Sequence, residues 1–377
     1  MEVDLDALAY NARQIRTSLD PGILCIGVVK GDGYGHGALP VAKTILEEGI
    51  EWLGVADLWE AQELRAGGIK EPILVFSPAP DAAAFAVSMD VRMTVCDLSF
   101  ARALAWAARR KGRLIKVHLK VDCGMGRLGV LPQEAADLAG RILRLEGLEL
   151  EGIYTHFPQG EKLRPTQRQL DVFVALCRAL HQRGIHIPLR HCASSKTLYS
   201  LPQSHLEMVR VGTLLYGQGG KGFKETWRLK TRPIFRKVLP PGSGVGYGRE
   251  YVTKKRTSIG VLPIGYADGV SLEPAPSPRR AWKHILRGLL RPSRPVKGPK
   301  ESLPLLGRVS MNMTTIGLPP DVDDNLEIQV RRTCINRRLP KVYLQGGRPV
   351  FVGFQGAYQS VEQIDDIYYL GRQKVHV

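Results

Sequence analysis

Residues 23–37 read ILCIGVVKGDGYGHG, and this stretch decides how the rest of the chain is interpreted. It begins with an apolar run that has the length of a buried strand and continues into Lys30 and four glycines at alternate positions. A lysine at the end of a buried strand is partly desolvated, which lowers its pKa and suits it to Schiff-base formation. The glycines let the backbone turn tightly and approach a ligand. The stretch therefore predicts a strand that ends in a reactive amine.

Seven more apolar runs follow within the first 215 residues, and the eight runs together span residues 23–30, 52–56, 72–77, 93–96, 116–122, 150–156, 188–194 and 208–212. Amphipathic stretches such as ALPVAKTILEEG at 38–49 separate most of them. Alternating strands and helices predict an α/β fold with a parallel sheet covered by helices. Eight repeats of this kind predict a TIM-type (β/α)8 barrel.

The pattern changes after Gly217, where residues 229–270 and 303–356 are β-rich. We therefore expect a barrel domain over residues 1–225, followed by a smaller, mainly-β C-terminal domain over residues 226–377. A basic stretch with several prolines interrupts the second domain near residues 273–300 and contains WKHILRGLL. We expect a surface insertion there, with a short basic amphipathic helix as the alternative.

The net charge of +17 raises the question of an anionic partner. The excess is uneven, because residues 276–348 hold 15 Lys and Arg against 5 Asp and Glu. A protein that binds nucleic acid with its whole surface would not show this distribution, so nucleic acid is not an expected partner. Six scattered cysteines without a C-x-x-C pair are typical of a reduced, cytoplasmic protein. No run approaches the roughly 20 apolar residues of a membrane span, and the acidic start MEVDLDAL is unlike a signal peptide.

Polar residues cluster where the apolar runs end, at Lys30, Lys120 with Asp122, His156, His191 with Ser194 and Ser195, and Arg210. In a TIM barrel the C-terminal ends of all the strands meet at one face, and that face carries the chemistry. These tips therefore predict one active site at the barrel mouth.

The segment VVKGDGYGHG at 28–37 resembles the cofactor-lysine motif of alanine racemases, whose usual form is VVKADAYGHG. Further blocks resemble the same family in the same order: EVDLDAL at 2–8, where the family has its opening helix, KVDCGMGRLGV at 120–130, GIYTHF at 152–157, HCASSKTL at 191–198, MVRVGTLLYG at 208–217, GYGREY at 246–251, LPIGYADG at 262–269 and GRVSMNM at 307–313. On these blocks the chain is identified as a member of the alanine racemase family.

The resemblance implies a racemase that interconverts L- and D-alanine with pyridoxal 5'-phosphate and supplies D-alanine for peptidoglycan. It implies that Lys30 binds the cofactor as an aldimine and acts as one of two opposed acid–base groups. Tyr247 would be the other, contributed by the second subunit of a homodimer with shared active sites. The substrate would be a small amino acid.

The resemblance also assigns the residues around the cofactor and the substrate. Tyr34, Ser195 and the backbone of Gly212 and Thr213 would bind the phosphate, with Ser194 beside them. Arg210 would hydrogen-bond the pyridine nitrogen, with His156 behind it. Arg127 would help to hold the substrate carboxylate, steadied by Lys120, which is a carbamate in many members of the family. Tyr266 and Met311 would line the substrate entrance and pocket.

Three features depart from the family pattern. Ser194 stands where the family has asparagine, and Asn312 stands where it has an acidic residue. A late tyrosine contacts phosphate in the family, and no residue of this chain, which ends at Val377, is assigned to that role.

Two alternatives to an alanine racemase remain open. The first is a racemase of the same fold that acts on serine or another small amino acid, since one methylene in a pocket is worth only about 1–3 kcal/mol. The second is an inactive homologue whose basic segment binds nucleic acid or an anionic surface.

Overall fold

The computed structural model describes residues 1–272, 296–298, 302–322, 326–330, 336, 338–354 and 356–361. The chain divides into two compact units, each described by itself below. The barrel unit comprises Leu5–Tyr34 and Ala38–Thr226, and the second unit comprises Met1–Asp4, Gly35–Gly37 and the described part of Trp227–Val377. Most of the basic stretch at 273–300, for which we expect a surface insertion or alternatively a short helix at WKHILRGLL, lies outside the described residues. Across the described ranges, no helix is both long and apolar enough to cross a membrane.

Eight parallel strands form the barrel unit: β2 (Leu24–Val28), β3 (Trp52–Val55), β4 (Ile73–Val75), β5 (Arg92–Val95), β6 (Ile115–Lys120), β7 (Leu148–Tyr154), β8 (Leu189–His191) and β9 (Met208–Val211). The strands are ordered β8-β7-β6-β5-β4-β3-β2-β9. A parallel bridge between Ser194 and Arg210 joins the two ends and nearly closes the sheet. Each strand lies within or next to a predicted apolar run, so the predicted (β/α)8 barrel is confirmed.

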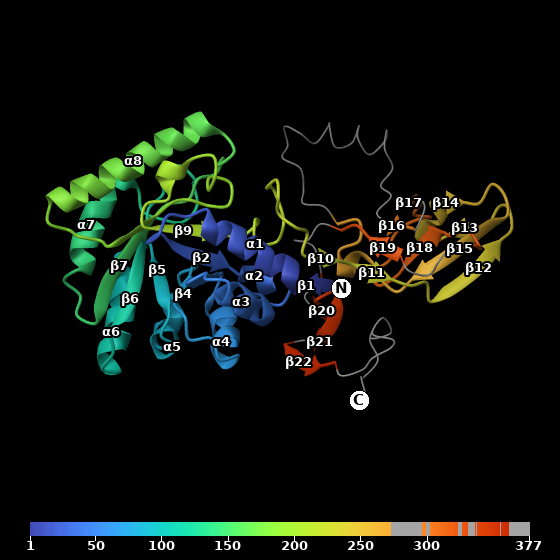
Figure 1. Ribbon diagram of the computed structural model, residues 1–377, viewed down its shortest axis with the longest axis horizontal. Helices are drawn as coiled ribbons and strands as arrows, with labels where there is room; N and C mark the ends of the chain where they lie inside the picture. Colours follow the sequence, from blue (N-terminus) through green and yellow to red (C-terminus); the bar gives the residue numbers. More distant parts are fainter. Residues whose placement is uncertain are drawn as a thin grey trace. The chain divides into compact units, whose positions relative to one another are not determined.

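The main helices lie outside the ring of strands (Figure 1): α1 (Leu5–Thr17), α3 (Ala38–Glu47), α4 (Leu58–Ala66), α5 (Ala83–Ser88), α6 (Leu98–Arg110), α7 (Pro132–Ile142) and α8 (Leu163–Gln182). Helix α6 shows why they form. The Asp97 side chain caps it by accepting the N–H of Phe100 at 2.8 Å, and Phe100, Leu104 and Ala108 share its buried face at helical spacing. Between β8 and β9 the structure has only a 3-10 turn, Pro202–Ser204.

The barrel strands place different side chains on their two faces, because neighbouring residues of a strand point to opposite sides. In β6 the apolar Ile115, Val117 and Leu119 belong to the core beneath the helices. Lys116, His118 and Lys120 alternate with them and point into the barrel. The barrel interior is therefore partly polar, and this is where the candidate site lies.

The second unit is built mainly of β-strands, in agreement with the predicted C-terminal domain. In its described part, one sheet has the order β10-β1-β20-β21-β22, a second β11-β19-β16-β17 and a third β12-β15-β18, and β13 pairs with β14. The bounds are β1 (Glu2–Asp4), β10 (Trp227–Arg228), β11 (Lys230–Thr231), β12 (Phe235–Leu239), β13 (Gly244–Val245), β14 (Tyr251–Val252), β15 (Thr257–Leu262), β16 (Val296–Lys297), β17 (Ser302–Leu303), β18 (Thr314–Gly317), β19 (Leu326–Ile328), β20 (Lys341–Gln345), β21 (Arg348–Phe354) and β22 (Ala357–Ser360).

The start of the chain differs from the expected opening helix at residues 2–8. Residues Glu2–Asp4 are strand β1, which pairs in parallel with β20 and antiparallel with β10, and helix α1 begins only at Leu5. The alternation of side chains over Glu2–Asp4 suits a strand, and the two neighbouring strands supply its backbone hydrogen bonds.

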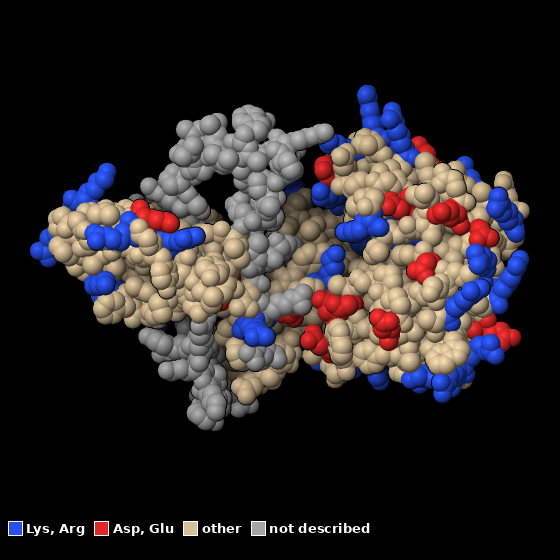
Figure 2. All heavy atoms as spheres, turned by 180° about the vertical axis from the view of Figure 1, so that it is seen from behind, with Lys and Arg blue, Asp and Glu red and all other residues tan. Residues whose placement is uncertain are grey.

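Charged side chains are mixed on the surface of the barrel unit. On the face shown in Figure 2, its Lys and Arg side chains are interspersed with Asp and Glu. A mixed surface of this kind differs from the single-sign field of a nucleic-acid-binding face.

Candidate active site

Lys30 stands at the mouth of the barrel, two residues after the end of β2, and begins the short element α2 (Lys30–Tyr34). Gly31, Asp32, Gly33 and Tyr34 have φ between 54° and 70°, so the turn after the lysine is left-handed. Such a backbone is unfavourable for residues with a Cβ, and tertiary contacts must hold it.

Buried Glu60, from helix α4, holds this turn in place. Its carboxylate accepts the N–H of Gly31 at 2.6 Å and that of Ala56 at 2.8 Å, which ties the turn to the end of β3. Asp32 accepts the N–H of Ala38 at 2.9 Å and so ties the turn to the start of α3. The position of Lys30 is thereby fixed from both sides.

The electrostatic environment favours the neutral amine of Lys30. Loss of hydration at the barrel mouth lowers the pKa of Lys30, and the positive charges of Arg127 and Arg210 lower it further, while Glu60 opposes them. The side chain remains accessible from outside. A lysine with a lowered pKa and an accessible amine is suited to form a covalent bond with a carbonyl compound.

Backbone N–H groups gather around Ser195, across the barrel mouth. Its Oγ accepts the N–H of Gly212 at 2.9 Å and lies 3.4 Å from the N–H of Leu214. A Cβ at Gly212 would lie 2.7 Å from the Tyr34 hydroxyl, so only glycine leaves room there. The structure thus brings together Tyr34, Ser195 and Gly212, with Thr213 next in the chain. Ser194 is held beside them by its own N–H, which donates to Thr197 Oγ1 at 2.9 Å.

Arg210 lies at the centre of the barrel mouth on β9 and is buried. Its guanidinium donates to Nδ1 of His191 at 2.9 Å and to the carbonyl of Thr155 at 2.8 Å, and it lies 3.3 Å from Nδ1 of His156. Burial and the charge of Arg210 lower the pKa of His156 to about 3, and the same two causes hold the pKa of His191 well below its usual range. Both imidazoles are therefore neutral acceptors for the arginine.

Lys120 is buried at the end of β6, and its Nζ donates to the carbonyl of Val121 at 3.1 Å. Burial and the charge of Arg210 lower the pKa of Lys120 to about 7. Its ammonium lies 4.9 Å from the centre of the Tyr154 ring, and the Arg210 guanidinium lies 5.1 Å from the same ring. The face of an aromatic ring stabilises nearby cations, so Tyr154 helps to hold two positive charges in a small space.

Arg127 is exposed in the loop that follows β6. Asp122 organises this loop by accepting the N–H groups of Gly124, Met125 and Arg127 at 2.7–2.9 Å. Partial burial by itself would raise the pKa of Asp122, but the donated N–H groups lower it below its usual range. The loop therefore keeps a negative charge that fixes its backbone, and the Arg127 side chain remains available at the mouth.

The remaining sequence-predicted residues belong to the second unit, where Tyr247, Tyr266 and Met311 are all exposed. Tyr247 begins a one-turn 3-10 helix. The strand before it packs closely on Gly307, since a Cβ on Gly307 would lie 2.4 Å from the Val245 carbonyl oxygen. The Tyr266 N–H donates to the Ser310 carbonyl at 3.0 Å, next to Met311. Segment 307–311 therefore contacts both tyrosine-bearing turns.

The sequence interpretation missed four residues that the barrel places around the site: Glu60, His118, Glu151 and Tyr154. Glu60 gave no signal, because an acidic residue in the first turn of a helix is common. The alternation Lys116, His118 and Lys120 in one buried strand was a usable signal, since polar residues at period two must share one face.

Two family models match the chain in order. The model described as "Alanine racemase, N-terminal domain" matches residues 3–219, and "Alanine racemase, C-terminal domain" matches residues 226–337. An alanine racemase of Desulfovibrio desulfuricans is 40% identical over 326 residues, which cover 84% of this chain and 83% of the relative. One of Clostridium tetani is 33% identical, with 93% and 96% covered.

Solved structures agree with the family models. An alanine racemase of Clostridium difficile 630 superimposes with a TM-score of 0.83 at 28% identity, covering 94% of this chain and 97% of that one. An alanine racemase of Bacillus anthracis, solved with bound L-Ala-P, gives a TM-score of 0.82 at 28% identity, covering 94% and 96%. The family matches span most of both units and coincide with the barrel and its lysine, and the chain therefore belongs to the alanine racemase family.

Proposed function

We propose that this protein is a pyridoxal-phosphate-dependent racemase that interconverts L- and D-alanine. The observation that carries the proposal is the pairing of an accessible, pKa-lowered Lys30 with a buried Arg210 at the mouth of one barrel. The relatives are named alanine racemases, and one was solved with bound L-Ala-P. These support the choice of alanine over serine or another small amino acid.

The residues at the barrel mouth fit pyridoxal phosphate. Lys30 would bind it covalently, and the backbone N–H groups of Gly212 and Thr213, with the hydroxyls of Ser195 and Tyr34, would bind its phosphate. A Cβ at Gly212 would fill the space beside Tyr34, so the glycine keeps that cradle open. Ser194 would help to hold the cofactor where the family uses asparagine. When bound, the cofactor delocalises the electron pair left by removal of the substrate's α-proton.

Arg210 would face the ring nitrogen of the cofactor, with His156 behind it. An arginine keeps its proton at all ordinary pH values, so it would donate a hydrogen bond without transferring the proton. The negative charge that develops in the reaction would therefore stay near the α-carbon. This favours return of a proton there over side reactions at other atoms.

Racemisation needs a proton removed from one face of the α-carbon and returned on the other, so two acid–base groups must oppose each other. Lys30 would serve one face, and Tyr247, from the second subunit of a homodimer, the other. Arg127 would hold the substrate carboxylate, and Tyr266 and Met311 would line the entrance. Lys120, whose pKa of about 7 leaves neutral amine available, is the candidate for a carbamate beside Arg127.

The proposal also covers the setting of the reaction. We assign residues 1–225, apart from the short segments 1–4 and 35–37, to the cofactor-binding barrel, and residues 226–377 to the β-rich domain that supplies Tyr247. The product D-alanine would be made in the cytoplasm for peptidoglycan, and depletion of the protein should then make cells require added D-alanine.

The test is covalent capture of the cofactor. Borohydride treatment of the protein loaded with pyridoxal phosphate should place a stable label on the peptide that contains Lys30. The Lys30→Ala variant should lose the label and the conversion of L-alanine to D-alanine, and Lys43→Ala, at an exposed lysine on α3, should keep both. A label elsewhere, or faster turnover of serine than of alanine, would contradict the proposal.

A further inference from the structure

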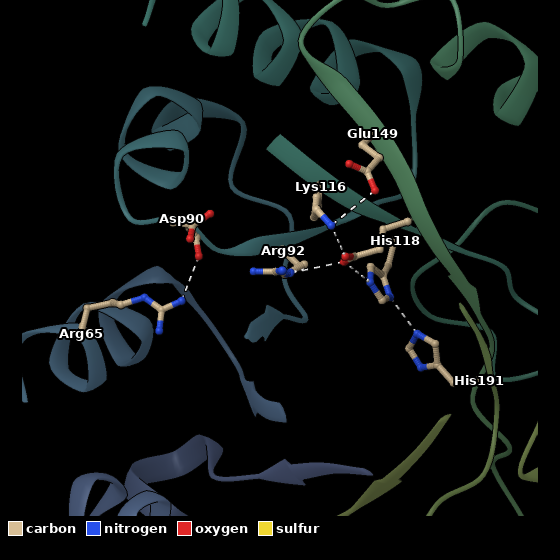
Figure 3. A network of polar contacts seen from close by, with 8 residues as sticks. Arg65, Asp90, Arg92, Lys116, His118, Glu149 and His191 are labelled. Carbon is tan, nitrogen blue, oxygen red and sulfur yellow. Dashed lines mark hydrogen bonds and ion pairs between the residues drawn. The ribbon is translucent and has the colours of Figure 1, made fainter. Parts of the chain in front are cut away.

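A line of buried polar side chains runs from Arg210 down the barrel interior, away from the mouth. Arg210 donates to Nδ1 of His191 at 2.9 Å, and Nε2 of His191 lies 2.8 Å from Nδ1 of His118. Nε2 of His118 lies 3.3 Å from Oε2 of Glu151. All four residues are more than nine-tenths buried, and both histidines are fully buried. Figure 3 shows His118 and His191 together with Lys116 and Arg92, which lie at the end of the line farther from Arg210.

The chemistry of Arg210 determines the direction of every hydrogen bond in this line. Arginine has only donors, so Nδ1 of His191 must accept and carries no proton. A neutral His191 then has its proton on Nε2 and donates to Nδ1 of His118. By the same reasoning His118 has its proton on Nε2 and donates to Glu151. The line therefore has one orientation, with each proton pointing away from Arg210 and toward the carboxylate.

The charge states agree with this orientation. Burial lowers the pKa of His118, so it is neutral near pH 7, as is His191. Burial alone would raise the pKa of Glu151, but hydrogen bonds from His118 and Lys116 and the charge of Arg92 lower it to about 2. Lys116 lies 2.8 Å from Glu151 Oε1, and Arg92 lies 3.3 Å from Oε2. The line therefore ends on a carboxylate that stays ionised.

The backbone is adapted to hold the line. His118 pairs with Gly152 across β6 and β7, and a Cβ at Gly152 would lie 2.4 Å from Nδ1 of His118. The register of the two strands shifts between Val117 and His118, which re-aims the histidine. The Tyr154 ring stacks on His191, with 4.7 Å between ring centres and an angle of 5° between planes.

We propose that Glu151 and His118 are positioning residues for racemisation, which act through His191 to hold Arg210 in place as a charged donor. The inference rests on the proposed function, since it concerns the arginine that would face the cofactor's ring nitrogen. Each donor in the line polarises the next, so the Glu151 carboxylate makes Nδ1 of His191 a stronger acceptor for Arg210. A stronger acceptor fixes the guanidinium in one orientation and keeps its charge.

The test compares two substitutions of the same kind on the same strand. Glu151→Gln removes the carboxylate from His118, and its amide can donate to Nε2 of His118 and reverse the direction of the line. Glu149→Gln is the matched control, because Glu149 also pairs with Lys116, at 3.4 Å, and it lies nearer the surface. Glu151→Asp keeps a carboxylate and should restore part of what Glu151→Gln loses.

The first measurement is nitrogen-15 NMR of histidine-labelled protein without substrate. In the wild type, His118 and His191 should both be neutral with the proton on Nε2, and this result needs no variant that might fail to fold. Glu151→Gln should shift the proton of at least one of the two histidines to Nδ1, and Glu149→Gln should shift neither. A wild-type protein with Nδ1 protonated on either histidine would overturn the inference.

The second measurement is turnover of L-alanine by the protein loaded with pyridoxal phosphate. Glu151→Gln should lower kcat by about 10- to 100-fold, because misplaced active-site groups cost rates of this order, with a much smaller change in KM. Glu149→Gln should stay within about twofold. If the wild type racemises alanine and Glu151→Gln matches Glu149→Gln in turnover, the positioning role is wrong. If the wild type itself does not racemise alanine, the proposed function is wrong instead.

Discussion

Lys120 shows how one buried amine couples the site to pH. Its pKa falls to about 7 in the fold, through burial and the charge of Arg210, from an ordinary value of 10.5. Between these two values the unfolded chain binds more protons than the folded one, so the free energy of unfolding rises with pH in that window. The contribution of this one group is at most about 1.4 kcal/mol per pH unit.

In the Lys120→Met variant, the free energy of unfolding should therefore rise less steeply between pH 7 and 10.5 than it does in the wild type. Urea unfolding at several pH values measures this slope. Lys43→Met, at an exposed lysine, is the control and should keep the wild-type slope. An unchanged slope in Lys120→Met would contradict a free amine with a lowered pKa at this position.

Gly152, like Gly212, is a residue whose identity the structure explains by the space around it. Gly152→Ala places a Cβ against the His118 ring and should lower the free energy of unfolding by about 1–3 kcal/mol. Gly140→Ala in α7 is the control, because a Cβ there meets nothing closer than Ile185 at 4.0 Å. That change should stabilise the helix by about 0.5–1 kcal/mol. In thermal unfolding, the midpoint should fall for Gly152→Ala and rise for Gly140→Ala.

Among the elements, the left-handed turn at residues 31–34 depends on Glu60, a partner from helix α4. Glu60→Gln replaces one acceptor oxygen by an N–H group that faces a backbone donor, and it should cost about 1–3 kcal/mol. It should also weaken retention of pyridoxal phosphate, since Lys30 opens this turn. Glu63→Gln, at an exposed position of α4, tests whether any charge loss on the helix has that effect. Equal cofactor retention in both variants would count against a role for Glu60.

At the scale of elements, the sequence predicted those features that local patterns determine. The barrel strands were found because each is a short apolar run, and their polar tips predicted the barrel mouth. The inward-pointing His118 and Glu151 were not predicted: the alternation in β6 marks the face that His118 shares with Lys116 and Lys120, but its partners lie on other strands. The register shift at Val117 and His118 depends on how β6 meets β7, which is a tertiary property. The glycines predicted a tight turn after Lys30, but its left-handed backbone and the contribution of Glu60 were missed.

At the scale of the whole molecule, we expect activity to require a dimer in which each site takes Lys30 from one chain and Tyr247 from the other. Both groups must reach opposite faces of one α-carbon, within about 3–3.5 Å. Mixing inactive Lys30→Ala with inactive Tyr247→Phe subunits should then restore activity, because one site of each mixed C2 dimer carries neither change. Turnover per mixed dimer should approach half the wild-type rate.

Each single variant alone provides the control for this mixing experiment. No recovery of turnover, despite subunit exchange shown by mass spectrometry, would contradict a shared site. Full activity of a monomer at every protein concentration would contradict it as well.

The long-range pairing of β1 was the main feature of the whole molecule that the sequence left open. Three residues cannot specify a partner by pattern alone, and the resemblance had placed them at the start of a helix. The structure instead sets Glu2–Asp4 between β10 and β20.

That pairing has a consequence for synthesis of the chain on the ribosome. Residues 2–4 are translated early, yet their parallel neighbours are residues 342–344, and the sheet that contains both cannot form until those residues leave the exit tunnel. The barrel, whose strands all lie between residues 24 and 211, can fold while the rest is still being translated. The edge of β1 that pairs with β20 must keep its hydrogen bonds to water until then, even if β10 has already paired with the other edge, so this closure is a late step and a contact of very high sequence separation.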